Sequence, residues 1–200
     1  MLHCSKITTA LFLGFAFIST SQTKNAEDSK YTFKKIYHLD NTPVESQGNA
    51  GTCWSFSALS FLESELMRLR KRKPSELSEM YIVRKAYELK ADKFIRMDGK
   101  INFGEGGAFH DVPLVIKNFG IVPKDAYNTN FNEIKGYDHA TLFKDINDYM
   151  QKLLAQVGTP KGLDLSWKKE YNQILDKYFG EDLQKFKWEE KTYSPKTYAE

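Results

Sequence analysis

A glycine-rich turn that runs directly into a long amphipathic pattern is the feature that most constrains the fold of this chain. The turn spans residues 47–51 (QGNAG), and after it apolar side chains recur every three or four residues, at Trp54, Ala58, Leu59, Leu62, Leu66 and Leu69. This spacing predicts a helix with one buried face. We expect Thr52 to cap the first turn and Lys73-Pro74 to end the helix. Cys53 is therefore expected in the first helical turn.

The mature chain is expected to contain a single cysteine. The segment Ile7–Ile18 is almost entirely apolar and follows Lys6, which is typical of a secretory signal peptide. We therefore predict that residues 1–21 are removed, that the protein is secreted or periplasmic, and that no later segment crosses a membrane. Cys4 leaves with this segment. The thiol of Cys53 then has no partner within the chain, so it is either reactive or buried as a small hydrophobic side chain.

The remainder of the chain is predicted to be mostly helical. A flexible, polar arm is expected over residues 22–35, and a glycine-rich loop over 97–107. Further helices are expected from near Ser78, over about 109–118, near 141–156 and at 167–179. The basic run at 68–73 (RLRKRK) is interpreted as a solvated helix end and not as a nucleic-acid site, because no aromatic residue is interleaved with it.

The surroundings of Cys53 favour a reactive thiol over a buried one. The thiolate is the nucleophilic form of cysteine, and the start of a helix favours negative charge. Acyl transfer also needs hydrogen-bond donors aimed at the developing oxyanion. The backbone N–H of Cys53 and the side-chain amide of Gln47 are the candidate donors, and Gly48 and Gly51 let the turn bring them together. Trp54 is expected to form an apolar wall that shields the site.

The segment Gln47–Ser57 (QGNAGTCWSFS) resembles the active-site segment of papain-like cysteine peptidases. Ala50 stands where most papain relatives carry a disulfide cysteine, so the chain is most similar to the bleomycin hydrolase and aminopeptidase C branch. Three further segments resemble that branch, namely 77–79 (LSE), 106–124 with NFGIVPK at its end, and 193–196 (YSPK).

The resemblance implies an α+β papain-like fold, represented mainly by its helical half. Residues 36–128 would be this half with the nucleophile, 129–190 a helical insertion, and 191–200 the return to the peptidase core. The strand-rich half is expected to be missing. The resemblance thus covers about residues 36–200.

The resemblance also implies roles for individual residues. Cys53 would be the nucleophile and Gln47 the oxyanion donor, while Gly106 and Gly107 would pair with an extended substrate beside Trp54. The implied function is a cysteine-type peptidase, an aminopeptidase acting on peptide substrates, with no cofactor, metal or nucleic acid. Because relatives form hexamers, a homo-oligomer is implied as well.

A thiol peptidase needs a histidine base oriented by an asparagine, and this sequence has no matching histidine. His3, His38, His110 and His139 all lie where the family places no catalytic base. We expect either a longer chain or a decayed homologue. In the first case residues 22–200 alone should lack activity and leave an apolar face of the Cys53 helix uncovered.

Two alternatives to a peptidase come from other classes. A catalytically inactive papain-like protein could hold extended peptides along Gly106-Gly107. A thiol-redox protein is disfavoured because there is no Cys-x-x-Cys pair, and metal binding because Cys53 and the histidines lack ligand spacing.

Overall fold

The computed structural model describes residues 30–31, 33–70, 76–127, 129, 131, 137–157 and 164–200. The chain divides into two compact units, Met1–His38 and Leu39–Glu200, and the described residues of the first unit contain no helix or strand. The predicted signal peptide (1–21) and most of the predicted arm (22–35) lie outside the described residues. All elements below belong to the second unit.

The first helix, α1, spans Cys53–Arg70 and begins at the predicted residue. The backbone N–H groups of Ser55 and Phe56 both donate to the carbonyl of Thr52, which closes the first turn. Two details of the prediction are wrong. The Thr52 hydroxyl is buried without a hydrogen-bond partner, so it does not cap the helix. Leu69 is 67% exposed, and Met67 takes the buried position near the end of the helix instead.

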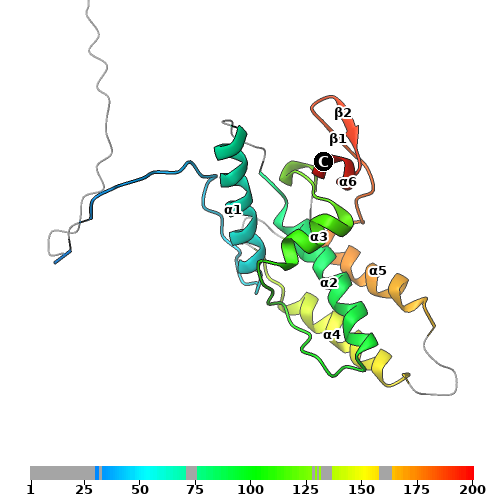
Figure 1. Cartoon of the computed structure of the whole chain (residues 1–200). Coiled ribbons are helices and arrows are strands. Elements are labelled where there is room, and N and C mark those ends of the chain that lie inside the picture. The colour runs from blue at the N-terminus through cyan, green and yellow to red at the C-terminus, as the bar shows by residue number, and fades with distance from the viewer. Residues whose placement is uncertain are drawn as a thin grey trace, which may run out of the picture. The chain divides into compact units, whose positions relative to one another are not determined.

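The second helix, α2 (Glu79–Arg96), is the centre of the unit. Its N-cap is Ser78, whose hydroxyl accepts a hydrogen bond from the Tyr81 N–H at 3.2 Å. Every residue from Glu79 to Tyr87 is buried, because α2 contacts α1, α3, α4 and α5 (Figure 1). A helix covered on all sides cannot have the single apolar face that sequence periodicity detects.

The remaining helices lie close to their predicted positions. They are α3 (Asp111–Phe119), α4 (Ala140–Leu154) and α5 (Trp167–Phe179), whereas the short 3-10 helix η1 (Lys124–Ala126) was not predicted. Gly120 and Gly180 follow α3 and α5 with φ of +89° and +78°, in the region that favours glycine. Helices α4 and α5 pack against each other and against α2.

Two short strands and a final helix complete the unit. Strands β1 (Phe186–Trp188) and β2 (Lys191–Tyr193) pair antiparallel, with Phe186 opposite Tyr193. Helix α6 (Pro195–Ala199) begins with a capping box between Ser194 and Thr197. The backbone N–H of Ile121 donates to the carbonyl of Pro195 at 3.0 Å, so α6 is joined to the segment after α3.

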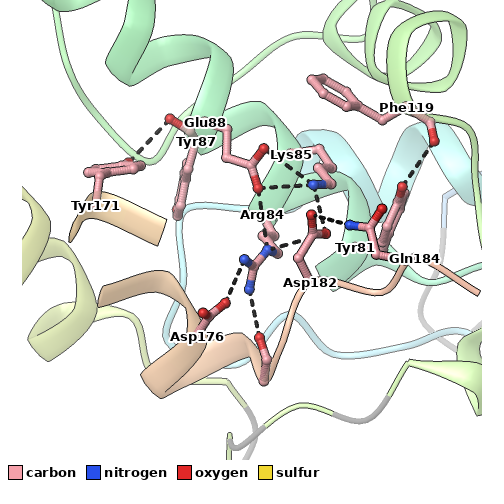
Figure 2. A network of polar contacts seen from close by, with 11 residues as sticks. Tyr81, Arg84, Lys85, Tyr87, Glu88, Phe119, Tyr171, Asp176, Asp182 and Gln184 are labelled. Atoms are coloured by element: carbon pink, nitrogen blue, oxygen red, sulfur yellow. Dashed lines mark hydrogen bonds and ion pairs between the residues drawn. The ribbon is translucent and has the colours of Figure 1, made fainter. Parts of the chain in front are cut away.

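A buried charge network joins α2 to α5 (Figure 2). The fully buried guanidinium of Arg84 donates to an Asp176 oxygen and to the Gly180 carbonyl, both at 2.6 Å. Lys85 lies 2.7 Å from Asp182 and 3.1 Å from Glu88. This network joins the C-terminal end of α5 and the residues after it to α2.

Two structural searches gave negative results within the described ranges. None of the helices there combines the length and the hydropathy that a membrane span requires. No group of three or more His, Cys, Asp or Glu side chains is placed there to hold a metal ion.

Candidate active site

The thiol of Cys53 is exposed at the N-terminus of α1. The glycine-rich turn places it there: Gly48 has φ of +60°, which a residue with a side chain rarely adopts, and the helix begins five residues later, at Cys53. A helix start presents unpaired N–H groups and the positive end of the helix dipole. An exposed sulfur at this point is available to a ligand, as a nucleophile must be.

The side chain of Gln47 lies across the turn that leads to Cys53. Its Nε2 donates to the carbonyl of Ala50 at 2.5 Å, which holds the amide beside the backbone of the turn. An amide nitrogen carries two N–H groups, so a second donor remains. The oxyanion role assigned to Gln47 stays a prediction.

Trp54 is buried and packs under the loop that carries Gly106 and Gly107. Its indole N–H donates to the carbonyl of Glu105 at 3.1 Å, and the ring lies against Gly107, where an added Cβ would be only 2.6 Å from a ring carbon. Trp54 therefore supports the glycine loop from below. Its predicted contact with substrate is not tested by this geometry.

The two predicted substrate-binding glycines have different surroundings. Both are exposed, but a Cβ on Gly106 would meet no atom within 4 Å, whereas one on Gly107 would meet Trp54. The side-chain position of Gly106 thus faces open space, while its carbonyl accepts from Lys90, and the backbone at Gly107 is supported from behind by Trp54. This arrangement suits a strand-like contact with an extended chain.

Lys90 holds the glycine loop, and sequence reasoning missed it. Its ammonium donates to the carbonyls of Gly104 and Gly106 at 3.1 and 2.5 Å, and it lies 5.4 Å from the centre of the Trp54 ring. Burial lowers the pKa of Lys90. A lysine near the end of an amphipathic helix is ordinarily solvated, so the sequence held no signal for this role.

The histidines of the described chain make no hydrogen bond to Cys53. His139 is fully buried, with Nδ1 3.3 Å from the Tyr87 hydroxyl and its ring stacked on Phe131. Burial lowers the pKa of His139 to about 4, so it is neutral at physiological pH. His110 is exposed beside Asp111. His139 is thus a packed interior residue and His110 a surface residue.

Comparison with known proteins gives one family and several relatives. The model of the papain family cysteine protease matches residues 30–153. Aminopeptidase G of Lactobacillus delbrueckii subsp. lactis is 26% identical over 155 residues, which are 68% of this chain and 36% of that protein. Aminopeptidase C of the same organism is 25% identical over 158 residues, 71% of this chain and 33% of that protein.

A yeast protein and a crystal structure extend the comparison. Cysteine proteinase 1, mitochondrial, of Saccharomyces cerevisiae is 24% identical over 123 residues, 54% of this chain and 26% of that protein. The crystal structure of PepW from Lactobacillus rhamnosis superposes with a TM-score of 0.64 at 20% identity, covering 80% of this chain and 43% of that one. The chain thus spans only about a third of the length of the curated relatives it matches.

Proposed function

The chain belongs to the papain family of cysteine proteases, and on that premise we propose that it is a thiol peptidase with Cys53 as its nucleophile. The observation that carries the proposal is the exposed sulfur of Cys53 at the start of α1. The free space beside Gly106, where a Cβ would meet no atom within 4 Å, supports it, because a peptide could lie along that loop.

The proposed reaction proceeds through two steps at one sulfur. The Cys53 thiolate attacks the carbonyl carbon of the scissile peptide bond, and the negative charge moves to the carbonyl oxygen. The backbone N–H of Cys53 and the free amide N–H of Gln47 would donate to that oxygen. Collapse of this intermediate expels the amine and leaves an acyl-enzyme, which water hydrolyses to restore the thiol.

The proton transfers of this scheme need a base that the described residues do not hold next to Cys53. We propose that a histidine outside these 200 residues supplies it. This is supported by the relatives, about three times as long as the matched segment. The proposal predicts that residues 22–200 alone do not turn over peptides.

We further propose that the enzyme is an aminopeptidase, which the names of two relatives support. Its export is proposed from the apolar segment Ile7–Ile18 alone. A catalytically inactive peptide-binding protein is the second candidate. It is favoured by one observation, the lack of a hydrogen bond between Cys53 and any histidine of the described chain.

The test is Cys53-dependent cleavage by the full-length protein. Peptides with a free and with an acetylated N-terminus are incubated with wild type, Cys53→Ala, Gln47→Ala and the surface control Glu65→Ala. We expect Cys53→Ala to abolish turnover and Gln47→Ala to lower kcat roughly 10²–10³-fold. Glu65→Ala should match wild type, and the acetylated peptide should resist cleavage.

Three outcomes would separate the candidates. Turnover that survives Cys53→Ala overturns the thiol mechanism. Equal cleavage of the acetylated peptide overturns the aminopeptidase assignment but leaves the peptidase. Peptide binding without any release of product by the wild-type protein identifies the inactive binding protein.

A further inference from the structure

The carboxylate of Glu105 contacts the turn that carries the nucleophile. Its Oε2 accepts a hydrogen bond from the backbone N–H of Gly51 at 2.6 Å, across 54 residues of sequence. Gly51 lies two residues before Cys53 and inside the turn that begins at Gln47. The contact therefore joins the glycine loop to the turn that must hold both the sulfur and the oxyanion donor.

The backbone of Glu105 is itself held in place. Its carbonyl accepts from the Trp54 indole at 3.1 Å, and the Lys90 ammonium lies 3.5 Å away while bonding to the carbonyls on either side. A carboxylate on such a supported backbone reaches Gly51 from a fixed origin. A glutamate on a mobile surface segment would lose more conformational entropy when it forms such a contact.

Packing at this contact leaves no spare room. A Cβ built on Gly51 would lie 2.9 Å from the Cβ of Glu105, closer than real side chains approach. Cys53 is the one cysteine in the described ranges, so no disulfide joins the two loops there. The hydrogen bond and this close approach are what tie them.

The other side of the turn is tied to the start of α4. The N–H of Asn49 donates to the carbonyl of Tyr137 at 2.6 Å, and the N–H of His139 donates to the carbonyl of Asn49 at 3.2 Å. The His139 Nδ1 lies 3.9 Å from the Glu105 carboxylate. The turn is thus bonded to the segment before α4 through Asn49 and to the glycine loop through Gly51. Of these two residues, Gly51 is the nearer to Cys53 in sequence.

We propose that Glu105 is a positioning residue, whose hydrogen bond to Gly51 keeps the 47–53 turn in the arrangement that the thiol and its oxyanion donors require. This inference rests on the proposed thiol peptidase function. The role depends on the side-chain oxygen as a hydrogen-bond acceptor and not on its negative charge, because the partner is a backbone N–H. Glutamine should therefore replace glutamate, and alanine should not.

The experiment compares Glu105→Ala, Glu105→Gln and the surface control Glu65→Gln in the full-length protein. We expect Glu105→Ala to lower kcat by roughly ten- to a hundredfold while KM changes less than about threefold, since a small displacement of reacting groups has effects of this size. Glu105→Gln should stay within about threefold of wild type in kcat. Hydrogen exchange of the Gly51 amide, followed by NMR on glycine-labelled protein, should become about tenfold faster in Glu105→Ala only.

Each other outcome overturns the inference in a distinct way. An unchanged kcat in Glu105→Ala, or a loss that glutamine does not rescue, removes the positioning role. A rise in KM alone would assign Glu105 to the peptide groove instead. If Glu105→Ala does not fold, Glu105→Gln still tests the inference. A wild-type kcat in Glu105→Gln together with fast hydrogen exchange of the Gly51 amide would contradict the positioning role. Turnover that survives Cys53→Ala contradicts the proposed function instead. In that case hydrogen exchange of the Gly51 amide still tests the hydrogen bond between Gly51 and Glu105.

Discussion

Gly106 and Gly107 are adjacent in sequence, but only Gly107 has no room for a side chain. The ring of Trp54 occupies the space that a Cβ at residue 107 would need, while residue 106 faces open space. Trp54 cannot move away easily, because its indole is bonded to the Glu105 carbonyl and its side chain is buried. The requirement for glycine at 107 is therefore steric.

This asymmetry predicts different stabilities for two otherwise matched variants. Gly107→Ala should destabilise the folded state by about 1–3 kcal/mol, the usual cost of inserting a methyl group into a packed site. Gly106→Ala should change the free energy of unfolding by much less. Urea denaturation followed by tryptophan fluorescence measures both. Equal losses in the two variants would contradict the contact with Trp54.

The position of Cys53 could be predicted from the sequence, whereas its supports could not. A glycine-rich turn followed by a helical period gives a local signal, and the exposed sulfur at the start of α1 agrees with it. Glu105 and Lys90 act through contacts 14 or more residues away, the longest across 54 residues. No local pattern records such contacts, since an isolated glutamate or lysine is ordinarily a surface residue.

Among the secondary-structure elements, long helices were predicted well and short elements were not. The expected helices agree with α1 to α5, because α1, α4 and α5 repeat an apolar pattern over several turns and the Ser78 cap marks the start of α2. Strands β1 and β2 have three residues each and α6 has five, too few for a period to appear. Ser194 followed by Pro195 at the first helical position is a local signal that could have indicated α6.

The hydrogen bonds of Arg84 that join α2 to the end of α5 are expected to contribute to stability. The guanidinium of Arg84 donates to Asp176 (Figure 2) and to the Gly180 carbonyl, and replacing Arg84 by Met removes both hydrogen bonds. The Asp176 side chain is 37% exposed and stays partly solvated, so the main cost is the lost hydrogen bonds, and we expect a loss of about 1–3 kcal/mol in the free energy of unfolding. Chemical denaturation measures it.

Arg68→Met is the matched control for this variant. Arg68 pairs with Glu65 on the surface of α1, and exposed pairs of this kind contribute little. It should unfold close to wild type. If both arginine variants lost the same stability, the network would be no more than a surface pair.

For the whole molecule, the resemblance and the fold are confirmed. The papain family match and the superposition on PepW support the papain-like fold, and the described residues are mainly helical with one two-stranded sheet. The predicted boundaries at 36–128, 129–190 and 191–200 stay predictions. One hydrophobic core includes residues from Ala50 to Phe186, so the proposed insertion shares its packing with α1.

Two buried groups give the whole molecule opposing responses to pH. Burial raises the pKa of Glu79 from 4.5 to about 7 and lowers the pKa of His139 from 6.5 to about 4. As the pH falls from 7 to 4.5, folded Glu79 takes up its proton before unfolded Glu79, so acidification stabilises the fold. As it falls from 6.5 to 4, unfolded His139 takes up its proton first, so acidification destabilises the fold.

The two effects oppose each other between about pH 4.5 and 6.5, and single variants should separate them. Each shift corresponds to about 3 kcal/mol over its full range. Glu79→Gln should lose stability on acidification from pH 7 to 4.5 relative to wild type, and His139→Gln should gain it. The neighbouring Glu63, whose pKa burial also raises, is present in all three proteins, and its charge is one of the smaller causes of the raised pKa of Glu79. Free energies of unfolding measured at several pH values would give this result, and parallel profiles would mean that neither group is buried in its uncharged form.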